Sequence, residues 1–367
     1  MLRFDRRLLD HIDWGVASLV LLLCALGWAT VLSATYEEAH PLSVFAKRQA
    51  VWMALGVAVL VAVQLFDYRW LERYAYLFYA LGTASLEAVR HVGSTGGGSQ
   101  RWLSLGGLSI QPSEFAKLFL VVALARYLQL RLDERGLSFR TVLGAVALVA
   151  PPALLTLVQP DLGTALLLVL VGSSVLVFAG VQLRWLFATV LLAGPLLPIV
   201  WNFLKPYQRA RILVFLDPHK DPLGTGYHMI QSQIAIGSGQ WFGRGYLHGP
   251  QNHLDFLPEQ HTDFVFSVFA EEWGFLGSVV LLALYAALIG RCLVVAYRAK
   301  DVFGMLLAAG FASLFFWHVT VNVAMASGLL PVVGMTLPFF SYGGSSLVTM
   351  MAAAGLVMNV SMRRFTF

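Results

Sequence analysis

Residues 14–34, WGVASLVLLLCALGWATVLSA, contain no charged side chain. A helix needs about 20 mostly apolar residues to cross the hydrocarbon core of a bilayer, because unpaired backbone groups cannot be left in lipid. This stretch is therefore predicted to be a transmembrane helix. About ten stretches of this kind occur along the chain. Their predicted centres are 14–34, 51–66, 74–89, 114–130, 141–158, 162–180, 185–203, 275–295, 303–329 and 345–361.

The composition of the whole chain agrees with a membrane protein. Charged residues make up 12% and hydrophobic residues 58% of the sequence, whereas about a quarter of the residues in soluble domains are charged. This leaves too little polar surface for a water-soluble particle. The sequence shows no short-period repeat and no soluble domain at either end. It therefore predicts a single all-α polytopic membrane domain over residues 1–367.

Basic residues indicate how the predicted helices are oriented. Lys and Arg collect in short cytoplasmic loops, and Arg69, Arg131, Arg184 and Arg298 all fall in loops on one side when the N-terminus is cytoplasmic. The first residues, MLRFDRRLLDHIDW, are interpreted as the flank of an uncleaved first helix. The stretch 205–274, between predicted helices 7 and 8, then faces outward. The net charge of +5 follows from this topology and does not indicate nucleic-acid binding.

Ionisable residues inside predicted helices are the first functional candidates, since each costs about 2.5–3.5 kcal/mol on insertion scales. In IQPSEFAKL, Glu114 and Lys117 lie three residues apart on one helix face and can neutralise each other. With Pro112 opening the helix, Glu114 is also explained by the helix dipole. Lys117 is not, and it needs an anionic group or a wet cavity. In QPDLGTALL, helix capping alone can explain Asp161.

The outward stretch 205–274 is rich in aromatic residues, which disordered segments lack, so short amphipathic pieces on the membrane surface are expected. Its second half collects acids and histidines. They are His253, Asp255, Glu259, His261, Asp263, Glu271 and Glu272. Apolar neighbours surround Asp255, and desolvation there raises a carboxyl pKa toward values useful for a general base. For Glu271 and Glu272 a solvated surface is as good an explanation as a function.

A protein-bound metal is weakly indicated. Suitable ligands are present at His253, Asp255, His261 and Asp263. No HExxH or similar spacing accompanies them. Cys24 and Cys292 fall within predicted transmembrane helices, so neither a disulfide framework nor a thiolate metal site is expected.

Glycine-rich stretches and arginines mark the remaining outward segments. Glycines and serines in 91–111 predict flexible turns around Arg101 and Trp102. The glycines of AIGSGQWFGRG do not match a nucleotide-binding loop and are expected to allow tight backbone packing. Arginine suits diphosphate recognition, with interfacial anchoring as the alternative. The arginines on this face are Arg101, Arg209, Arg211 and Arg244.

The segment before the last helix, LPFFSYGGSSL, contains small polar residues, including Ser341 and Ser345. Gly343 and Gly344 permit close approach of the backbone to a helix or a ligand.

Taken in order, these motifs resemble one family along nearly the whole chain, the SEDS proteins (shape, elongation, division and sporulation). They are GSQRW with IQPSEFAKL, QPDLGTALL, YQRARI, GYHMIQSQIAIGSGQWFGRG, LDFLPEQHTDFVFSVFAEEWGFLG and LPFFSYGGSSL. The FDYRWLERYA segment is more similar to the elongation branch, represented by RodA, than to the division branch, represented by FtsW. The polar stretch SLEAVRHVGSTGGGSQRW departs from the family pattern near the end of the third predicted helix.

The resemblance implies a peptidoglycan glycosyltransferase of the bacterial cytoplasmic membrane that polymerises lipid II outside that membrane. It implies Asp255 as the catalytic acid-base residue and a single-pass class B penicillin-binding protein as the partner. A divalent cation, Mg or Mn, is a further expectation. Substrate-binding roles are expected for Glu114, Lys117, Arg101, Arg211, Asp161, Glu259, Asp263, Ser341 and Ser345.

Two other functions remain open on the sequence. A lipid II flippase would use intramembrane charges such as Glu114 and Lys117 along its path. A non-catalytic scaffold would use the outward charges for protein contacts, and it would tolerate loss of Asp255.

Overall fold

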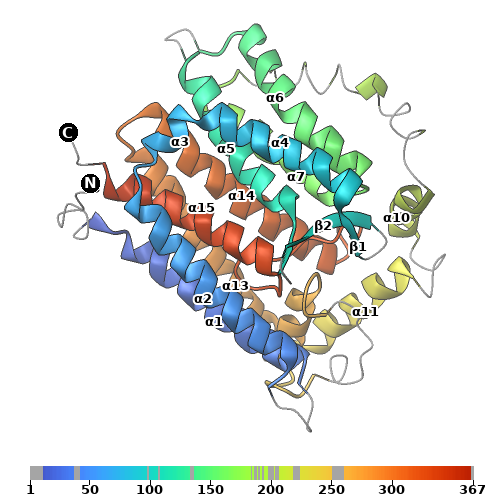
Figure 1. Cartoon of the computed structure of the whole chain (residues 1–367). Coiled ribbons are helices and arrows are strands. Elements are labelled where there is room, and N and C mark those ends of the chain that lie inside the picture. The colour runs from blue at the N-terminus through green and yellow to red at the C-terminus, as the bar shows by residue number, and fades with distance from the viewer. Residues whose placement is uncertain are drawn as a thin grey trace.

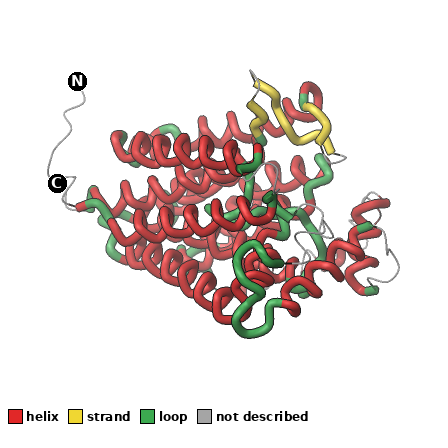
Figure 2. The backbone as a smooth tube through the Cα atoms, turned by 90° about the horizontal axis from the view of Figure 1, so that it is seen from below, coloured by secondary structure: helices red, strands yellow, loops and turns green. Residues whose placement is uncertain are grey.

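The computed structural model describes residues 11–36, 42–96, 99–105, 108–132, 136–182, 206–217, 224–249 and 260–364, and single short pieces between 184 and 202. The long helices run side by side in one bundle (Figures 1 and 2). The helices are α1 (Trp14–Ala34), α2 (Val44–Leu65), α3 (Arg69–Arg73), α4 (Ala75–Val92), α5 (Pro112–Gln129), α6 (Phe139–Val158), α7 (Leu162–Phe178), the 3-10 turn η2 (Gly194–Leu196), α10 (Pro206–Leu216), α11 (Thr225–Ser238), α13 (Val265–Tyr297), α14 (Val302–Ala326) and α15 (Gly344–Met362). The strands are β1 (Ser94–Gly96), β2 (Ser99–Leu105) and β3 (Leu108–Ile110).

Length and composition single out candidate membrane-spanning helices. Within the described ranges, 6 helices are long and apolar enough to cross a bilayer, namely α1, α2, α6, α13, α14 and α15. The apolar helix α7 is shorter. The chain is thus a mostly helical, multi-pass membrane protein. The predicted helix over 185–203 lies largely outside the described residues.

A small antiparallel sheet replaces the flexible turns that were predicted for 91–111, and the all-α prediction misses it. Strand order is β1-β2-β3, with Thr95 opposite Gln100 and Leu103 opposite Ile110. In the sequence, Gly-Gly pairs separate the three strands. Such pairs favour tight hairpin connections, whereas the prediction had taken them for flexible turns. The sheet lies at the end of the bundle opposite to the start of α1 (Figure 1).

Helix α13 is broken near its beginning. Its 33 residues would extend for about 50 Å if straight, but at Gly274 the backbone has φ 66° and ψ −165°. The segment after α11 docks its backbone onto this break: Arg244 N donates to Glu271 O at 2.9 Å, and Phe275 N donates to Gln240 O at 2.8 Å. These bonds satisfy backbone groups that a helix end leaves unpaired. The predicted tight packing of AIGSGQWFGRG is confirmed.

Glycine at 239 is required by this docking, and glycine at 237 is not. A Cβ at position 239 would collide with the Ala270 carbonyl oxygen, whereas a Cβ at position 237 meets nothing within 4 Å. Gly239→Ala is expected to destabilise the protein by about 1–3 kcal/mol through overpacking. Gly237→Ala, inside α11, should leave stability unchanged or raise it by up to about 1 kcal/mol. The check is thermal unfolding of both purified variants in detergent, and equal midpoints would contradict the docking.

Polar side chains join α15 to the end of α2. Asn359 is fully buried, and its Nδ2 donates to Val63 O at 2.7 Å and to Phe66 O at 2.6 Å. Its Oδ1 accepts a bond from Arg363 Nη1 at 2.6 Å, and Arg363 Nη2 donates to Gln64 O at 3.2 Å. The last carbonyls of α2 are therefore capped from a helix almost 300 residues away in sequence.

Replacing Asn359 with leucine should lower the thermal unfolding midpoint. The carbonyls of Val63 and Phe66 would lose the donor that Asn359 provides, and leaving a buried acceptor unsatisfied costs about 1–3 kcal/mol. A matched control exists on the same helix. Thr349 is also fully buried, and its hydroxyl has no hydrogen-bond partner within the described residues. Thr349→Val is expected to be neutral or stabilising, so an equal loss in both variants would refute the capping role of Asn359.

Candidate functional site

A buried lysine lies at the centre of the candidate site. Lys117, in α5, is 2% exposed. Its Nζ is 2.8 Å from Glu114 Oε1 and 3.0 Å from His318 Nε2. The predicted pairing of Glu114 with Lys117 is thereby confirmed. Since an ammonium group buried in the membrane must be paired or meet an anion, this cluster is the best-supported position for binding a charged ligand.

The start of α5 explains why these groups point inward. Pro112 occupies the first turn, Glu114 follows within it, and Glu114 N donates to Gln111 O at 3.1 Å. The positive end of the helix favours a carboxylate there. Within the described part of the chain, Ser113 Oγ and Glu114 Oε2 are buried and have no hydrogen-bond partner. These two atoms can therefore form hydrogen bonds with a ligand at this end of α5.

Sequence reasoning missed His318. This residue of α14 is 1% exposed, and its Nδ1 lies 3.2 Å from Thr336 O. An ionisable residue within the predicted helix 303–329 was itself a signal, because the cost argument applied to Lys117 applies to histidine as well.

One short segment, residues 331–336, brings the distant motifs together. Thr336 in this segment accepts the bond from His318, and its Oγ1 lies 2.8 Å from Ser346 Oγ. A Cβ at Gly163, in the QPDLGTALL motif, would lie 2.8 Å from Val333 O. The motifs around 161 and 345 therefore meet at this piece of backbone, and the motif around 114 is joined to it through His318.

Asp263 reaches this segment from the outward stretch. Asn322 Nδ2 donates to Asp263 O at 2.9 Å and to Met335 O at 2.5 Å. A Cβ at Gly334 would lie 3.2 Å from Asp263 Oδ2. Within the described residues, the buried Asn322 Oδ1 has no hydrogen-bond partner. Asp263 is thus brought close to the segment that Thr336 belongs to, and its role toward a substrate stays a prediction.

Arg101 and Asp161 are brought together as well. Arg101 Nη1 is 3.5 Å from Asp161 Oδ2, and the guanidinium also donates to the carbonyls of Gln159 and Pro160. Asp161 caps α7 by accepting from Thr164 N at 3.1 Å. The capping explanation for Asp161 is confirmed. A substrate-binding role for this pair stays a prediction.

Both predicted serines are used within the protein. Ser345 Oγ accepts from Gln111 N at 3.2 Å and donates to Ser109 O at 3.3 Å. Ser341 Oγ accepts from Leu337 N at 2.8 Å. The Ser345 hydroxyl joins the start of α15 to β3 and to the residue before α5, whereas the Ser341 hydroxyl stabilises the turn that precedes α15. Their role toward a substrate stays a prediction.

Glu271 and Glu272 are buried, which excludes a solvated surface as the explanation for them. They are 0% and 2% exposed. Ser238 Oγ donates to Glu271 Oε1 at 3.2 Å, and Leu247 N donates to Glu272 Oε1 at 3.2 Å, while Ser33 in α1 also donates to Glu272. Burial, and then the charge of Glu272, raises the pKa of the nearby Tyr246 phenol. The sequence left the two explanations open because the segment that buries these acids lies 25 or more residues away.

The structure does not describe several of the predicted site residues. Asp255, Glu259 and His253 are not among the described residues, and of Arg211 only the backbone in α10 is described. Cys24 and Cys292 lie buried in α1 and α13. Over the described ranges, no three or more His, Cys, Asp or Glu side chains form a group that could hold a metal ion.

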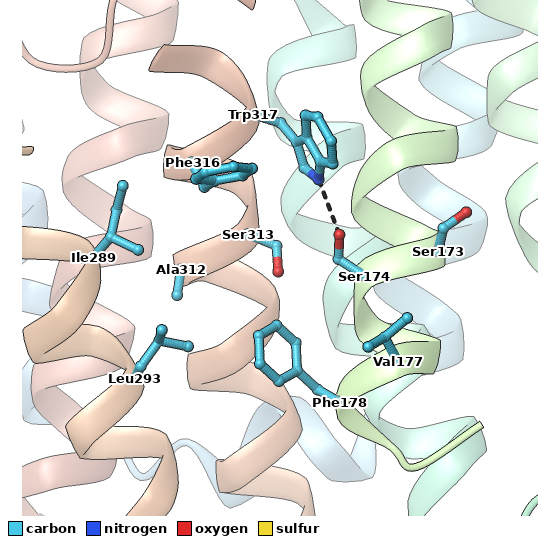
Figure 3. A pocket seen from close by; sticks show the side chains of 10 residues that line it. All are labelled: Ser173, Ser174, Val177, Phe178, Ile289, Leu293, Ala312, Ser313, Phe316 and Trp317. Carbon is cyan, nitrogen blue, oxygen red and sulfur yellow. Dashed lines mark hydrogen bonds between the residues drawn. The ribbon is translucent and has the colours of Figure 1, made fainter. Parts of the chain in front are cut away.

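A separate pocket opens between α7, α13 and α14 (Figure 3). Its volume is about 390 Å³. The lining residues are Ser173, Ser174, Val177, Phe178, Ile289, Leu293, Ala312, Ser313, Phe316 and Trp317. The hydroxyl of Ser174 accepts from Trp317 Nε1 at 2.9 Å. The pocket suits an apolar chain, but none of the described residues that line it is titratable, so they take no part in acid-base chemistry.

Comparison with known proteins shows close relatives. Residues 13–365 match the family model of the FtsW, RodA and SpoVE cell cycle proteins. The peptidoglycan glycosyltransferase MrdB of Escherichia coli is 41% identical over 355 residues, which cover 96% of this chain and 94% of that protein. The peptidoglycan glycosyltransferase RodA of Treponema pallidum is 33% identical over 425 residues, with 96% and 98% covered.

Solved structures are also similar to this chain. A chain in a structure on the coordination of polymerization and crosslinking by a peptidoglycan synthase complex has a TM-score of 0.83 and 37% identity, with 97% of this chain and 99% of that chain covered. The rod shape determining protein RodA of Thermus thermophilus has a TM-score of 0.73 and 33% identity, with 97% and 98% covered.

Proposed function

The chain belongs to the family of FtsW, RodA and SpoVE cell cycle proteins, and on this premise we propose that it is a peptidoglycan glycosyltransferase, which polymerises lipid II during cell elongation. The relatives MrdB and RodA carry that enzyme name. One structural observation carries the proposal: the ammonium of Lys117 is buried between Glu114 and His318 where the family motifs meet. An anionic group of the substrate is the ligand that such an ammonium recognises.

The substrate has a polyprenyl tail, a diphosphate and a polar sugar-peptide head. Lysine has three N–H donors, and in Lys117 two of them face Glu114 and His318. No described residue takes the third, and we propose that it donates to a phosphate oxygen. Arg101 and Arg211 are proposed to add positive charge, and Glu114 to orient Lys117. Asp161, Glu259, Asp263, Ser341 and Ser345 are proposed to bind the remaining polar groups.

The proposed reaction is one displacement with inversion. Asp255 takes the proton from the 4-hydroxyl of the acceptor sugar. The hydroxyl oxygen forms a bond to the anomeric carbon of the donor, and the bond from that carbon to the diphosphate oxygen breaks. Polyprenyl diphosphate leaves with the electron pair, and Lys117 stabilises the negative charge that develops on it.

We propose that the protein lies in the bacterial cytoplasmic membrane, with ten transmembrane helices and a cytoplasmic N-terminus. Stretch 205–274, between helices 7 and 8, then faces outward with Asp255. In support, the sheet, α10 and α11 lie at the end of the bundle away from the start of α1 (Figure 1). The proposed partner is a single-pass class B penicillin-binding protein that crosslinks the strands, since a similar chain occurs in a peptidoglycan synthase complex.

Purified protein should be incubated with lipid II, with and without the penicillin-binding partner, and glycan polymer measured on gels. Polymer is the expected result. Lipid II crossing liposome bilayers without polymer would indicate a flippase, and neither activity would indicate a scaffold. Since the described residues provide no metal site, the divalent cation remains a proposal that parallel reactions with Mg, Mn or a chelator test.

A further inference from the structure

We propose that His318 is a positioning residue, which holds the ammonium of Lys117 in the direction of the bound diphosphate. The inference rests on the proposed function and deepens it by adding a member to the site. His318 and Lys117 belong to different helices, α14 and α5, and both side chains are almost fully buried. Their contact is therefore protected from solvent and from competition by water.

The hydrogen bonds of His318 define which ring nitrogen carries its proton. Nδ1 lies 3.2 Å from Thr336 O, and a carbonyl oxygen can only accept. Nδ1 therefore donates, and in the neutral ring Nε2 keeps a lone pair. Nε2 lies 3.0 Å from Lys117 Nζ, so it accepts from the ammonium. This assignment follows from the network of partners.

The consequence is an ammonium held from two sides. Lysine ends in a compact charge on a flexible stem of four methylenes, which by itself does not fix a direction. Glu114 approaches Lys117 from the same helix at 2.8 Å, and His318 approaches it from α14. With two of three donors occupied, the third has a defined direction. Such fixed placement matters in catalysis, where a displacement of about 1 Å can cost roughly 100-fold in rate.

His318 could instead serve only to anchor the segment 331–336 through Thr336. The two roles use different ring nitrogens, so they can be separated by substitution. A glutamine amide reaches the place of Nε2 and retains an acceptor for Lys117, but it loses the bond to Thr336. An asparagine amide reaches the place of Nδ1 and retains the donor for Thr336, but it leaves Lys117 without its second acceptor.

The test compares His318→Gln and His318→Asn in the lipid II polymerisation assay, with thermal unfolding measured in parallel. We expect His318→Gln to remain within about threefold of wild type and His318→Asn to lose roughly 10- to 100-fold, with similar unfolding midpoints. Thr349→Val in α15 is the control, because the buried hydroxyl of Thr349 has no hydrogen-bond partner within the described residues. It should match wild type.

Three outcomes would overturn the inference. An active His318→Asn with an inactive His318→Gln assigns the histidine to anchoring the segment through Thr336. Full activity in both variants removes any role in the reaction. Inactivity of both with lowered midpoints assigns a folding role. Wild-type protein without polymer is a different result: it overturns the proposed function, whereas the outcomes above concern an active wild type.

Discussion

Asp255→Asn is expected to reduce glycan polymerisation by at least about 100-fold, the usual contribution of a general base. Asparagine has nearly the same shape as aspartate, but its amide cannot take up the proton of the attacking hydroxyl. The substitution does not alter the apolar residues on either side, Leu254 and Phe256. The measurement is polymer formed from lipid II by equal amounts of folded protein.

Asp217→Asn provides the control for this substitution. Asp217 follows α10 in the same outward stretch and donates its backbone N–H to Leu213 O at 3.1 Å. It belongs to no motif of the proposed site, so its neutralisation should leave polymerisation unchanged. Equal activity of Asp255→Asn and wild type would refute the role of Asp255 as base. In cells, tolerance of Asp255→Ala would favour the scaffold function.

Sequence alone could predict those features that depend on local pattern and on the cost of polar groups in lipid. The centres predicted for the fourth and last helices, 114–130 and 345–361, nearly coincide with α5 and α15. Glu114 and Lys117 were paired correctly because helical spacing places residues i and i+3 on one face. The predicted helix starting at 275 also agrees with the break at Gly274. Each of these inferences used only neighbouring residues.

Features created by distant contacts could not be predicted in the same way. Glu271 and Glu272 look like a solvated pair beside a helix, and their burial depends on docking of the segment 239–249. His318 joins Lys117 across 201 positions. Asp263 lies beside the segment before α15, and Asn322 of α14 bonds to each of them. The family resemblance named several of these positions, but it carried no information about which of them touch.

Lys117→Met is expected to abolish turnover, with a loss of about 100- to 1,000-fold or more, as for removal of one donor that stabilises developing charge. Methionine fills a similar volume, so the packing of α5 against α14 should be retained. The substitution also leaves the carboxylate of Glu114, 6% exposed, without its counter-charge. Breaking a buried ion pair from one side costs about 3–5 kcal/mol. Activity must therefore be compared at equal amounts of folded protein.

The double variant Glu114→Gln with Lys117→Met separates charge balance from catalysis. Because both charges are removed together, no buried carboxylate is left unpaired, and replacement of a buried ion pair by neutral groups is often tolerated. The double variant should unfold closer to wild type than Lys117→Met does and yet remain inactive. Polymer from the double variant at wild-type rates would mean that Lys117 only neutralises Glu114. Inactivity with restored stability would mean that the ammonium itself acts on the substrate, as expected from the third donor, which no described residue occupies.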